Sequence, residues 1–190
     1  MLRTLLVFIC LMLIQVTAHA DNQELFWKAL KEGGKVVLVR HAEIDRSMGD
    51  SFLLDESCFS EKNLNELGKS QAKNIAKAFK AHAIKVQQVF SSPHCRTKET
   101  AELAFGEFLV NPILRLTKAL TDEKANANLE KTRALISSYD NQDNLVLVTH
   151  RPNIGGLVHI RAEPAEMIVI QPLGDGLYDV ITRLTLTESN

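Results

Sequence analysis

Two short runs made almost only of valine and leucine constrain the fold of this 190-residue chain more than any other feature. They span residues 35–39 and 145–148. Continuous apolar runs of this kind are typical of strands that are buried on both faces of a sheet. Residues 86–90 are expected to form a third strand, and helical patterns lie between the three. The sequence therefore predicts an α/β fold: a three-layer sandwich with a mainly parallel central sheet and helices on both faces.

The segments between the strands carry helix signals. Ser91-Ser92-Pro93 predicts the start of one helix, with a serine cap and proline at the first helical position. That helix should run to Phe105 and end at Gly106. The other expected helices cover residues 24–31, 66–82 and 126–139 and a segment that begins at Pro152.

The remaining segments complete a single expected domain. Residues 42–65 have the composition of a polar loop, and residues 109–116 could form an edge strand that Pro112 interrupts. Residues 167–170 and 177–184 alternate apolar and polar side chains around a glycine-rich turn, which predicts a hairpin or paired edge strands. Because we find no repeat or linker, we expect one domain over residues 21–190.

Residues 1–20 have the pattern of a secretory signal peptide. Arg3 gives a positive start, residues 5–16 are almost all apolar, and Ala18 and Ala20 are small residues at the positions that a signal peptidase recognises. The apolar run is shorter than the roughly 20 residues that span a bilayer, and an uncleaved N-terminal anchor is the alternative. The sequence thus predicts an exported protein, periplasmic or secreted, without stable membrane insertion.

Cleavage after Ala20 would remove Cys10 and leave Cys58 and Cys95. Export makes a disulfide between these two residues chemically feasible, and an even number of cysteines favours it. Two free, buried thiols are the alternative, because the sequence does not give the distance between them.

The charge balance argues against one broad class of function. Lys and Arg together number 22 and Asp and Glu 23, so the formal net charge is −1. A protein that binds nucleic acid needs basic side chains in excess to neutralise phosphates. We therefore expect no nucleic-acid partner.

Basic side chains follow all three expected strands at the point where each strand ends. The first strand leads into Arg40-His41, the second into Ser91-Ser92-Pro93 and then Arg96, and the third into Thr149-His150-Arg151. Ligands of open α/β sheets bind outside the carboxyl ends of the strands. One histidine or arginine after a strand would indicate little, but three strand ends with the same chemistry predict a site.

These residue types favour phosphoryl chemistry. Arginine forks match the oxygens of a phosphate group and stay charged, and a helix N-terminus adds backbone N–H groups. An imidazole among such cations stays neutral and can attack phosphorus to form a covalent intermediate. A second imidazole can stabilise the charge that shifts during transfer.

The motifs resemble those of the histidine phosphatase superfamily, also called phosphoglycerate mutase-like. Arg40-His41-Ala42 resembles its Arg-His-Gly signature, with alanine in place of glycine. Ser91-Ser92-Pro93-His94-Cys95-Arg96 with Thr100-Ala101 resembles its second motif, and Val148-Thr149-His150 its third. The resemblance extends from about Gly34 to the C-terminus and implies the phosphoglycerate mutase-like sandwich.

The resemblance implies a role for each matching residue. His41 would be the nucleophile that accepts the phosphoryl group, and Arg40 and Arg96 would bind that group. His150 would complete the phosphate-binding site and stabilise the group in transfer. No metal and no other cofactor is expected, because the arginines supply the positive charge. Cys95, next to Arg96, would fix the backbone of that arginine if it were bonded to Cys58.

The proton donor is the part of the pattern that this sequence lacks. The acid-phosphatase branch has Asp directly after the second histidine, where this chain has Arg151. The mutase-like branch takes a Glu from the segment after the second arginine, where Asp122 and Glu123 lie, and Glu43 follows the nucleophile. Glu123 is the preferred candidate, and a site without a donor, as in short phosphohistidine phosphatases, is the alternative.

Three functions are compatible with these residues. The leading one is an exported, metal-independent phosphomonoesterase that forms a phosphohistidine on His41. Its site should be open, because no insertion is long enough to form a cap, and its substrate could be a phosphorylated sugar, a lipopolysaccharide core or a phosphoprotein. A phosphate-binding or phosphosugar-binding protein of the same fold with little or no turnover is the second. A metal site made of His41, His94, Cys95 and His150 is the third and has no paired ligand spacing. The oligomeric state is left open.

Overall fold

A six-stranded sheet forms the centre of the protein in the computed structural model, which describes residues 21–186. The expected signal peptide, residues 1–20, lies outside the described residues. The strands are β1 (Val36–Arg40), β2 (Val86–Ser91), β3 (Leu109–Val110), β4 (Asn144–Thr149), β5 (Met167–Gly174) and β6 (Leu177–Leu184), in the spatial order β3-β2-β4-β1-β5-β6. Strands β1 to β4 pair in parallel, and β5 is antiparallel to both β1 and β6. The prediction of a mainly parallel sheet is confirmed.

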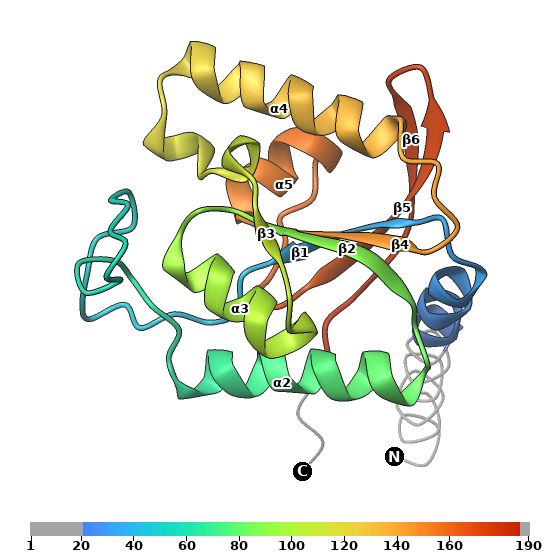
Figure 1. The fold of residues 1–190 in the computed structure, drawn as a ribbon, viewed down its shortest axis with the longest axis horizontal. Coiled ribbons are helices and arrows are strands. Elements are labelled where there is room, and N and C mark those ends of the chain that lie inside the picture. Colours follow the sequence, from blue (N-terminus) through green and yellow to red (C-terminus); the bar gives the residue numbers. More distant parts are fainter. Residues whose placement is uncertain (1–20, 187–190) are drawn as a thin grey trace, which may run out of the picture.

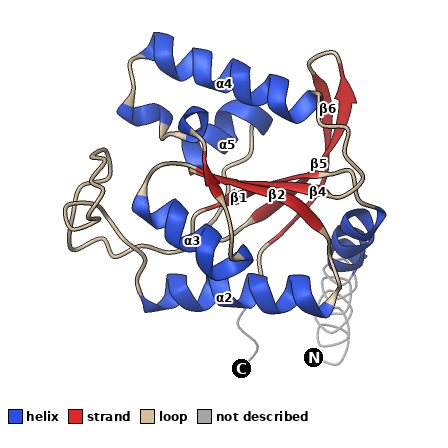
Figure 2. Ribbon diagram, in the orientation of Figure 1, coloured by secondary structure: helices blue, strands red, loops and turns tan. Residues whose placement is uncertain are grey.

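Helices cover both faces of this sheet (Figures 1 and 2). They are a helix over residues 21–32, α2 (Glu66–Ala81), α3 (Cys95–Phe105), α4 (Asp122–Ser137) and α5 (Arg151–Val158), with short 3-10 turns η1 (Pro112–Leu114) and η2 (Thr117–Ala119). Helices α2 and α3 lie on one face of the sheet, and α4 and α5 lie on the other. None of the helices within residues 21–186 is long and apolar enough to span a membrane.

Two separate apolar cores hold the three layers together. Val37 and Val39 of β1 point to a cluster that includes Ile75 and Phe79 of α2. The alternate residues Val36 and Leu38 point to the opposite cluster, which includes Ile136 of α4 and Ile154 of α5. Because successive side chains of a strand point to opposite faces, an unbroken apolar run supplies both cores at once.

The start of α2 closely approaches the end of β1. Asn65 caps this helix, since its Oδ1 accepts a hydrogen bond from the Gly68 N–H at 2.8 Å. A Cβ added to Gly68 would lie 2.0 Å from the backbone oxygen of Glu43, so only glycine fits at this contact. The contact holds the chain that follows His41 against the helical layer.

Two helices begin at residues that the sequence did not predict. Helix α3 starts at Cys95 rather than at Pro93, and its N-cap residue is His94 instead of Ser92. The orphan N–H of Cys95 is satisfied by the Glu61 carboxylate at 3.0 Å, which explains how α3 begins without a serine cap. Helix α4 starts at Asp122, four residues earlier than predicted, because the Thr121 side chain caps it.

Candidate active site

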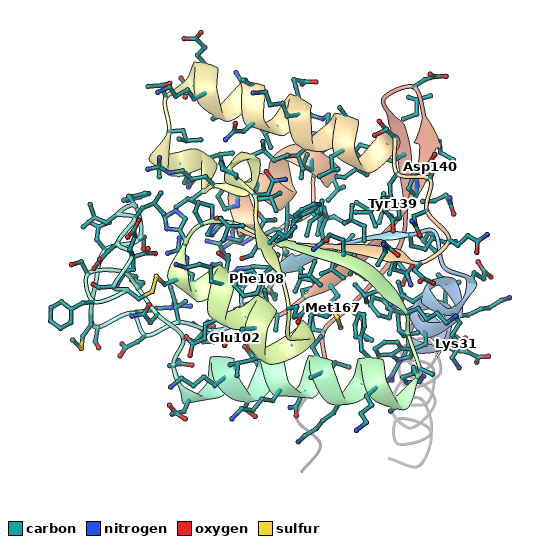
Figure 3. All side chains as sticks on the ribbon, in the orientation of Figure 1. Lys31, Glu102, Phe108, Tyr139, Asp140 and Met167 are labelled. Carbon is teal, nitrogen blue, oxygen red and sulfur yellow. A yellow bond between two sulfur atoms is a disulfide. The ribbon has the colours of Figure 1, made fainter. Side chains whose placement is uncertain are left out.

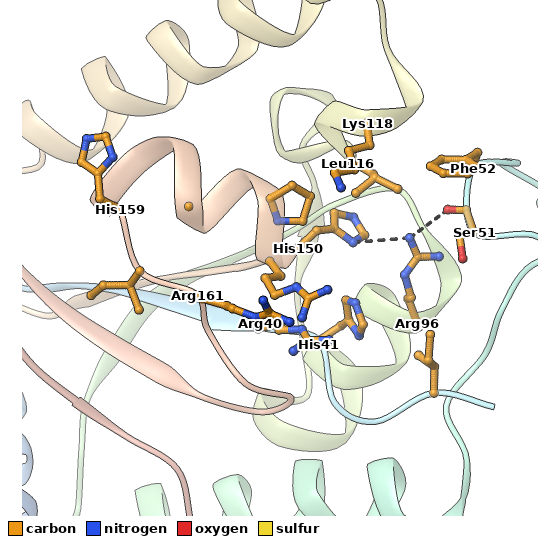
Figure 4. A pocket seen from close by; sticks show the side chains of 15 residues that line it. Arg40, His41, Ser51, Phe52, Arg96, Leu116, Lys118, His150, His159 and Arg161 are labelled. Atoms are coloured by element: carbon orange, nitrogen blue, oxygen red, sulfur yellow. Dashed lines mark hydrogen bonds between the residues drawn. The ribbon is translucent and has the colours of Figure 1, made fainter. Parts of the chain in front are cut away.

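The carboxyl ends of the parallel strands surround one cavity of about 680 Å³. Strand β1 brings Arg40 and His41 to it, the end of β4 brings His150, and the first turn of α3 brings Arg96 (Figure 4). The structure therefore brings together all four side chains that the strand ends predicted. All four are buried, with at most 9% of their surface exposed.

The imidazole of His41 is held in one orientation. Its Nδ1 lies 2.8 Å from the backbone oxygen of Ala42. A carbonyl oxygen only accepts hydrogen bonds, so Nδ1 carries the proton in the neutral ring and Nε2 keeps its lone pair. The N–H of Ala42 donates to Thr100 Oγ1 at 3.1 Å, and Thr100 donates to the Arg96 backbone oxygen at 2.7 Å. This bridge joins the backbone next to His41 to that of Arg96.

Burial keeps the His41 ring neutral. Loss of water, reinforced by the charges of Arg96 and Arg40, lowers the pKa of His41 to about 3, although the bond to Ala42 opposes the shift. A neutral imidazole has the free electron pair that nucleophilic attack requires. Near pH 7, His41 therefore has the protonation state of a nucleophile.

His150 faces His41 across the same cavity, and the two ring centroids are 5.5 Å apart. Burial lowers the pKa of His150 well below its ordinary value. Its Nε2 lies 2.8 Å from Ser92 Oγ, and its Nδ1 lies 3.4 Å from Arg96 Nη2. A hydroxyl group can donate or accept, so Ser92 is compatible with either tautomer of His150.

The guanidinium of Arg96 lies between the loop of residues 42–65 and His150 at the end of β4. Its Nη2 donates to the Ser51 backbone oxygen at 3.0 Å, and its Nη1 lies 4.0 Å from Glu61 Oε2. Nη1 is buried and has no hydrogen-bond acceptor among the described residues. Burial lowers the pKa of Arg96 to about 10, so it remains charged near pH 7. A buried, charged donor without an acceptor is suited to bind an anion.

Arg40 has a similar environment on the other side of His41. Its Nη1 donates to the Ala162 backbone oxygen at 2.8 Å, while its buried Nε has no acceptor within residues 21–186. Glu163 Oε2 lies 4.0 Å from Nη1. Burial, followed by the charge of Arg151, lowers the pKa of Arg40. Arg40 is thus a second buried cation that lines the cavity.

Glu61, which the sequence did not reveal, and His94, considered above only as a metal ligand, form a buried pair beside the cavity. His94 is fully buried, and the centroid of its ring lies 4.9 Å from that of His150. His94 Nδ1 lies 3.1 Å from Glu61 Oε2. Burial, helped by Arg96, lowers the pKa of His94 to about 4, against the opposing effect of Glu61. Glu61 comes from the segment expected to be a polar loop and carries no periodic signal, so only its spatial contacts reveal it.

The loop that contains Glu61 is covalently joined to α3. Cys58 and Cys95 form a disulfide with their Cα atoms 5.7 Å apart (Figure 3). Cys95 is the residue before Arg96, so the bond links the loop to the backbone of the second arginine. Ser51 and Phe52 of the same loop line the cavity.

The structure does not bring Glu123 to the cavity. Glu123 lies exposed on the first turn of α4, because Thr121 caps that helix earlier than expected, and it is not among the lining residues. Glu43 is paired with Arg46 at 3.1 Å and does not line the cavity either. The 15 residues that line it include no Asp or Glu. The candidate proton donor is thus misplaced for this role in the observed arrangement.

The metal-site hypothesis has no assembled ligand set in the described part of the chain. Residues 21–186 contain no group of three or more His, Cys, Asp or Glu side chains that could hold an ion. Cys95, one of the ligands considered, is part of the disulfide.

Known proteins share both the fold and part of the sequence. The model of the histidine phosphatase superfamily (branch 1) matches residues 36–122. An open reading frame product of Mycobacterium tuberculosis is 16% identical, with a TM-score of 0.61 over 80% of this chain and 97% of that one. The protein histidine phosphatase SixA, solved with tungstate, is 14% identical, with a TM-score of 0.58 over 80% and 96%. Phosphoglycerate mutase from Thermus thermophilus is 19% identical, with a TM-score of 0.55 over 80% and 99%. No curated protein matches the chain by sequence.

Sheet order, layers and site together define a phosphoglycerate mutase-like α/β sandwich. Over residues 36–122 the chain is similar to the histidine phosphatase superfamily, whose members are generally phosphatases or mutases.

Proposed function

We propose that this protein is a metal-independent phosphomonoesterase that acts through a phosphohistidine on His41. One observation carries the proposal: a neutral imidazole with a free Nε2 lies between two buried arginines, each with one side-chain nitrogen that has no acceptor among the described residues (Arg40 Nε and Arg96 Nη1). A phosphoryl group needs a nucleophile and balancing positive charge in one place, and this cavity provides both.

In the first step, the Nε2 lone pair of His41 attacks phosphorus. The N–P bond forms as the ester P–O bond breaks, and the electron pair of that bond leaves with the alcohol oxygen. Arg40 and Arg96 hold the non-bridging oxygens and balance their charge. No carboxylate of residues 21–186 lines the cavity to protonate the leaving oxygen, so its proton comes from water. The site therefore favours substrates whose leaving group needs little protonation.

His150 stabilises the group in transfer. When the phosphoryl oxygens engage Arg96, the Ser92 hydroxyl can donate to His150 Nε2 instead of accepting from it. For this change Nε2 gives its proton to water and Nδ1 takes a proton from water, and the Nδ1–H then donates to a phosphoryl oxygen. In the second step, water attacks phosphorus, the N–P bond breaks, its electron pair returns to Nε2, and phosphate leaves.

Rapid-quench labelling tests this reaction. Wild-type protein mixed with a ³²P-labelled monoester such as p-nitrophenyl phosphate should give an acid-labile, base-stable phosphoprotein within the first turnover. His41→Ala should give none and lose turnover. His82→Ala is the matched control, because the His82 ring stacks on Trp27 and does not line the cavity. Unchanged turnover in His41→Ala would disprove the proposal.

A binding protein with little turnover is the second candidate, and the absence of a carboxylate from the cavity lining favours it. This candidate predicts that wild type binds inorganic phosphate in calorimetry while the labelling experiment detects no phosphohistidine. The two functions thus give opposite results in one experiment.

We also propose that the mature protein is exported and begins at Asp21. The signal-like pattern of residues 1–20 and the Cys58–Cys95 disulfide support this location. N-terminal sequencing of protein recovered from outside the cytoplasm should start at Asp21, and an intact Met1 would contradict the cleavage.

A further inference from the structure

Glu61 makes more contacts next to Arg96 than a helix cap requires. It is buried, with only 2% of its surface exposed. Its Oε2 accepts a hydrogen bond from the Cys95 N–H at 3.0 Å, and the same oxygen lies 3.1 Å from His94 Nδ1 and 4.0 Å from Arg96 Nη1. Three consecutive residues, 94–96, therefore have one buried carboxylate oxygen as a common neighbour.

The other carboxylate oxygen of Glu61 holds the loop of residues 42–65. Oε1 accepts a hydrogen bond from the Asp55 N–H at 3.0 Å. The Ser51 backbone oxygen, which belongs to the same loop, accepts from Arg96 Nη2 at 3.0 Å. Glu61 thus connects the loop that supplies the acceptor for Nη2 to the first turn of the helix that carries Arg96.

The negative charge of Glu61 lies where a buried cation needs it. Arg96 is only 2% exposed, and burial lowers its pKa to about 10 while the charge of Glu61 opposes the shift. Among the described residues, Glu61 is the only acid with an oxygen within 4.0 Å of the Arg96 guanidinium. The carboxylate attracts the guanidinium from this distance, yet Nη1 stays without a hydrogen-bond acceptor. The pair therefore orients the cation and leaves one donor for an incoming oxyanion.

We infer that Glu61 is a positioning residue, which holds the guanidinium of Arg96 in the orientation that receives the phosphoryl group. This inference rests on the proposed function for the role of Arg96 and adds a residue to the machinery of the same site. Glu61 does not line the cavity, so it acts on the reaction only through Arg96. Such positioning matters because a displacement of about 1 Å, caused by a change away from the reacting atoms, can cost about 10²-fold in rate.

Glu61→Gln tests the role, because glutamine has nearly the same shape and lacks the charge. With p-nitrophenyl phosphate as substrate, we expect kcat/KM to fall about 10- to 100-fold. Glu56→Gln is the matched control, since Glu56 is an exposed acid of the same loop that does not line the cavity, and it should keep the wild-type kcat/KM. A fall of less than threefold in Glu61→Gln would overturn the inference.

The Arg96→Ala background separates positioning from a general structural role. If Glu61 acts through Arg96, adding Glu61→Gln to Arg96→Ala should reduce kcat/KM by less than threefold more, because the group to be positioned is already gone. If Glu61 only supports the fold, the second substitution should cost as much in this background as in wild type. A further loss of more than threefold would therefore contradict the inference.

Circular dichroism establishes that each variant is folded. If Glu61→Gln does not fold, Glu61→Asp takes its place in both backgrounds, because aspartate keeps the charge but withdraws it by one methylene group. We then expect a loss of about 3- to 10-fold in kcat/KM in otherwise wild-type protein and less than threefold beside Arg96→Ala. A loss below threefold in otherwise wild-type protein, or an equal loss in both backgrounds, would refute the positioning role.

Failure of this inference and failure of the proposed function give different results. If wild type is an active phosphatase and Glu61→Gln keeps its kcat/KM, the positioning role is wrong and the proposed function stands. If wild type hydrolyses nothing, the proposed function is wrong, and the affinity for inorganic phosphate, measured by ³¹P NMR titration, replaces kcat/KM in the same comparison. Weaker phosphate binding in Glu61→Gln that is absent beside Arg96→Ala then supports the role, and equal phosphate binding in Glu61→Gln and wild type overturns it.

Discussion

Acid should destabilise this protein through the histidines that are buried in its site. Burial lowers the pKa of His41 to about 3 and that of His94 to about 4, and it lowers the pKa of His150 well below its usual range. In the unfolded chain each ring has an ordinary pKa near ~6.5. Between these values the unfolded state binds protons that the folded state does not, so the free energy of unfolding falls as pH decreases from about 6.5.

The size of the effect follows from the width of that pH interval. One pH unit is worth about 1.4 kcal/mol for a group that is protonated only in the unfolded state. From about pH 6.5 to pH 5, His41 alone should therefore remove about 2 kcal/mol of stability. Domains of this size are commonly stable by about 5–15 kcal/mol, so a loss of this size is measurable.

Urea unfolding followed by circular dichroism at pH 5, 6, 7 and 8, with the disulfide intact, measures the effect. His41→Gln should reduce the difference in stability between pH 7 and pH 5 by about 2 kcal/mol relative to wild type. His159→Asn is the control, since His159 is exposed and asparagine tolerates its positive φ of 57°. The reasoning fails if His41→Gln and wild type lose the same free energy between these pH values.

Three further substitutions test other parts of the site. Arg96→Ala should lower kcat/KM by about 10²–10⁴ through loss of a charge partner of the transferring group, and a drop of less than tenfold would mean that Arg96 does not bind that group. In the folded protein, the Glu61 carboxylate opposes the lowering of the His94 pKa. Glu61→Gln should therefore lower the pKa of His94 further, which NMR titration of the His94 ring measures. An unchanged pKa of His94 would contradict this contact. Cys58→Ser removes the disulfide to Cys95, which closes a sequence separation of 37. The free energy of unfolding, measured in urea, should fall by up to about 4 kcal/mol. An unchanged free energy of unfolding would contradict a stabilising role of the disulfide.

The fold and the convergence of Arg40, His41, Arg96 and His150 on one cavity could be predicted because their signals are local. The apolar runs at β1 and β4 are buried on both faces, and such runs allow few other structures. His41 and His150 follow these runs directly, so the strand direction alone brings them to the same edge of the sheet. The position of Arg96 could be predicted from strand β2 and the turn that follows it.

The rest of the site depends on contacts between distant segments that leave no periodic pattern. Glu61 replaces the serine cap of α3 from a position 34 residues before Cys95, so local sequence placed the helix start too early. Glu123 was assigned by analogy of position, but the cap at Thr121 sets its helix in a register that exposes it. A few hydrogen bonds from capping side chains thus decide the residue at which a helix begins.

The position of β4 in the sheet sets when, during synthesis, the four buried side chains that line the cavity can come together. Strand β4 lies between β1 and β2 although it follows both in the chain, with Val36 opposite Leu145 and Ser91 opposite Val148. During synthesis, the backbone N–H and C=O groups on the facing edges of β1 and β2 therefore stay unpaired until residues 144–149 have been made. Such unpaired strand edges can pair with other chains and aggregate. Only when β4 inserts between β1 and β2 do Arg40 and His41, which follow β1, come close to Arg96, which follows β2. We therefore expect nascent chains that end before β4 to bind no phosphate. The same chains should depend most on a chaperone.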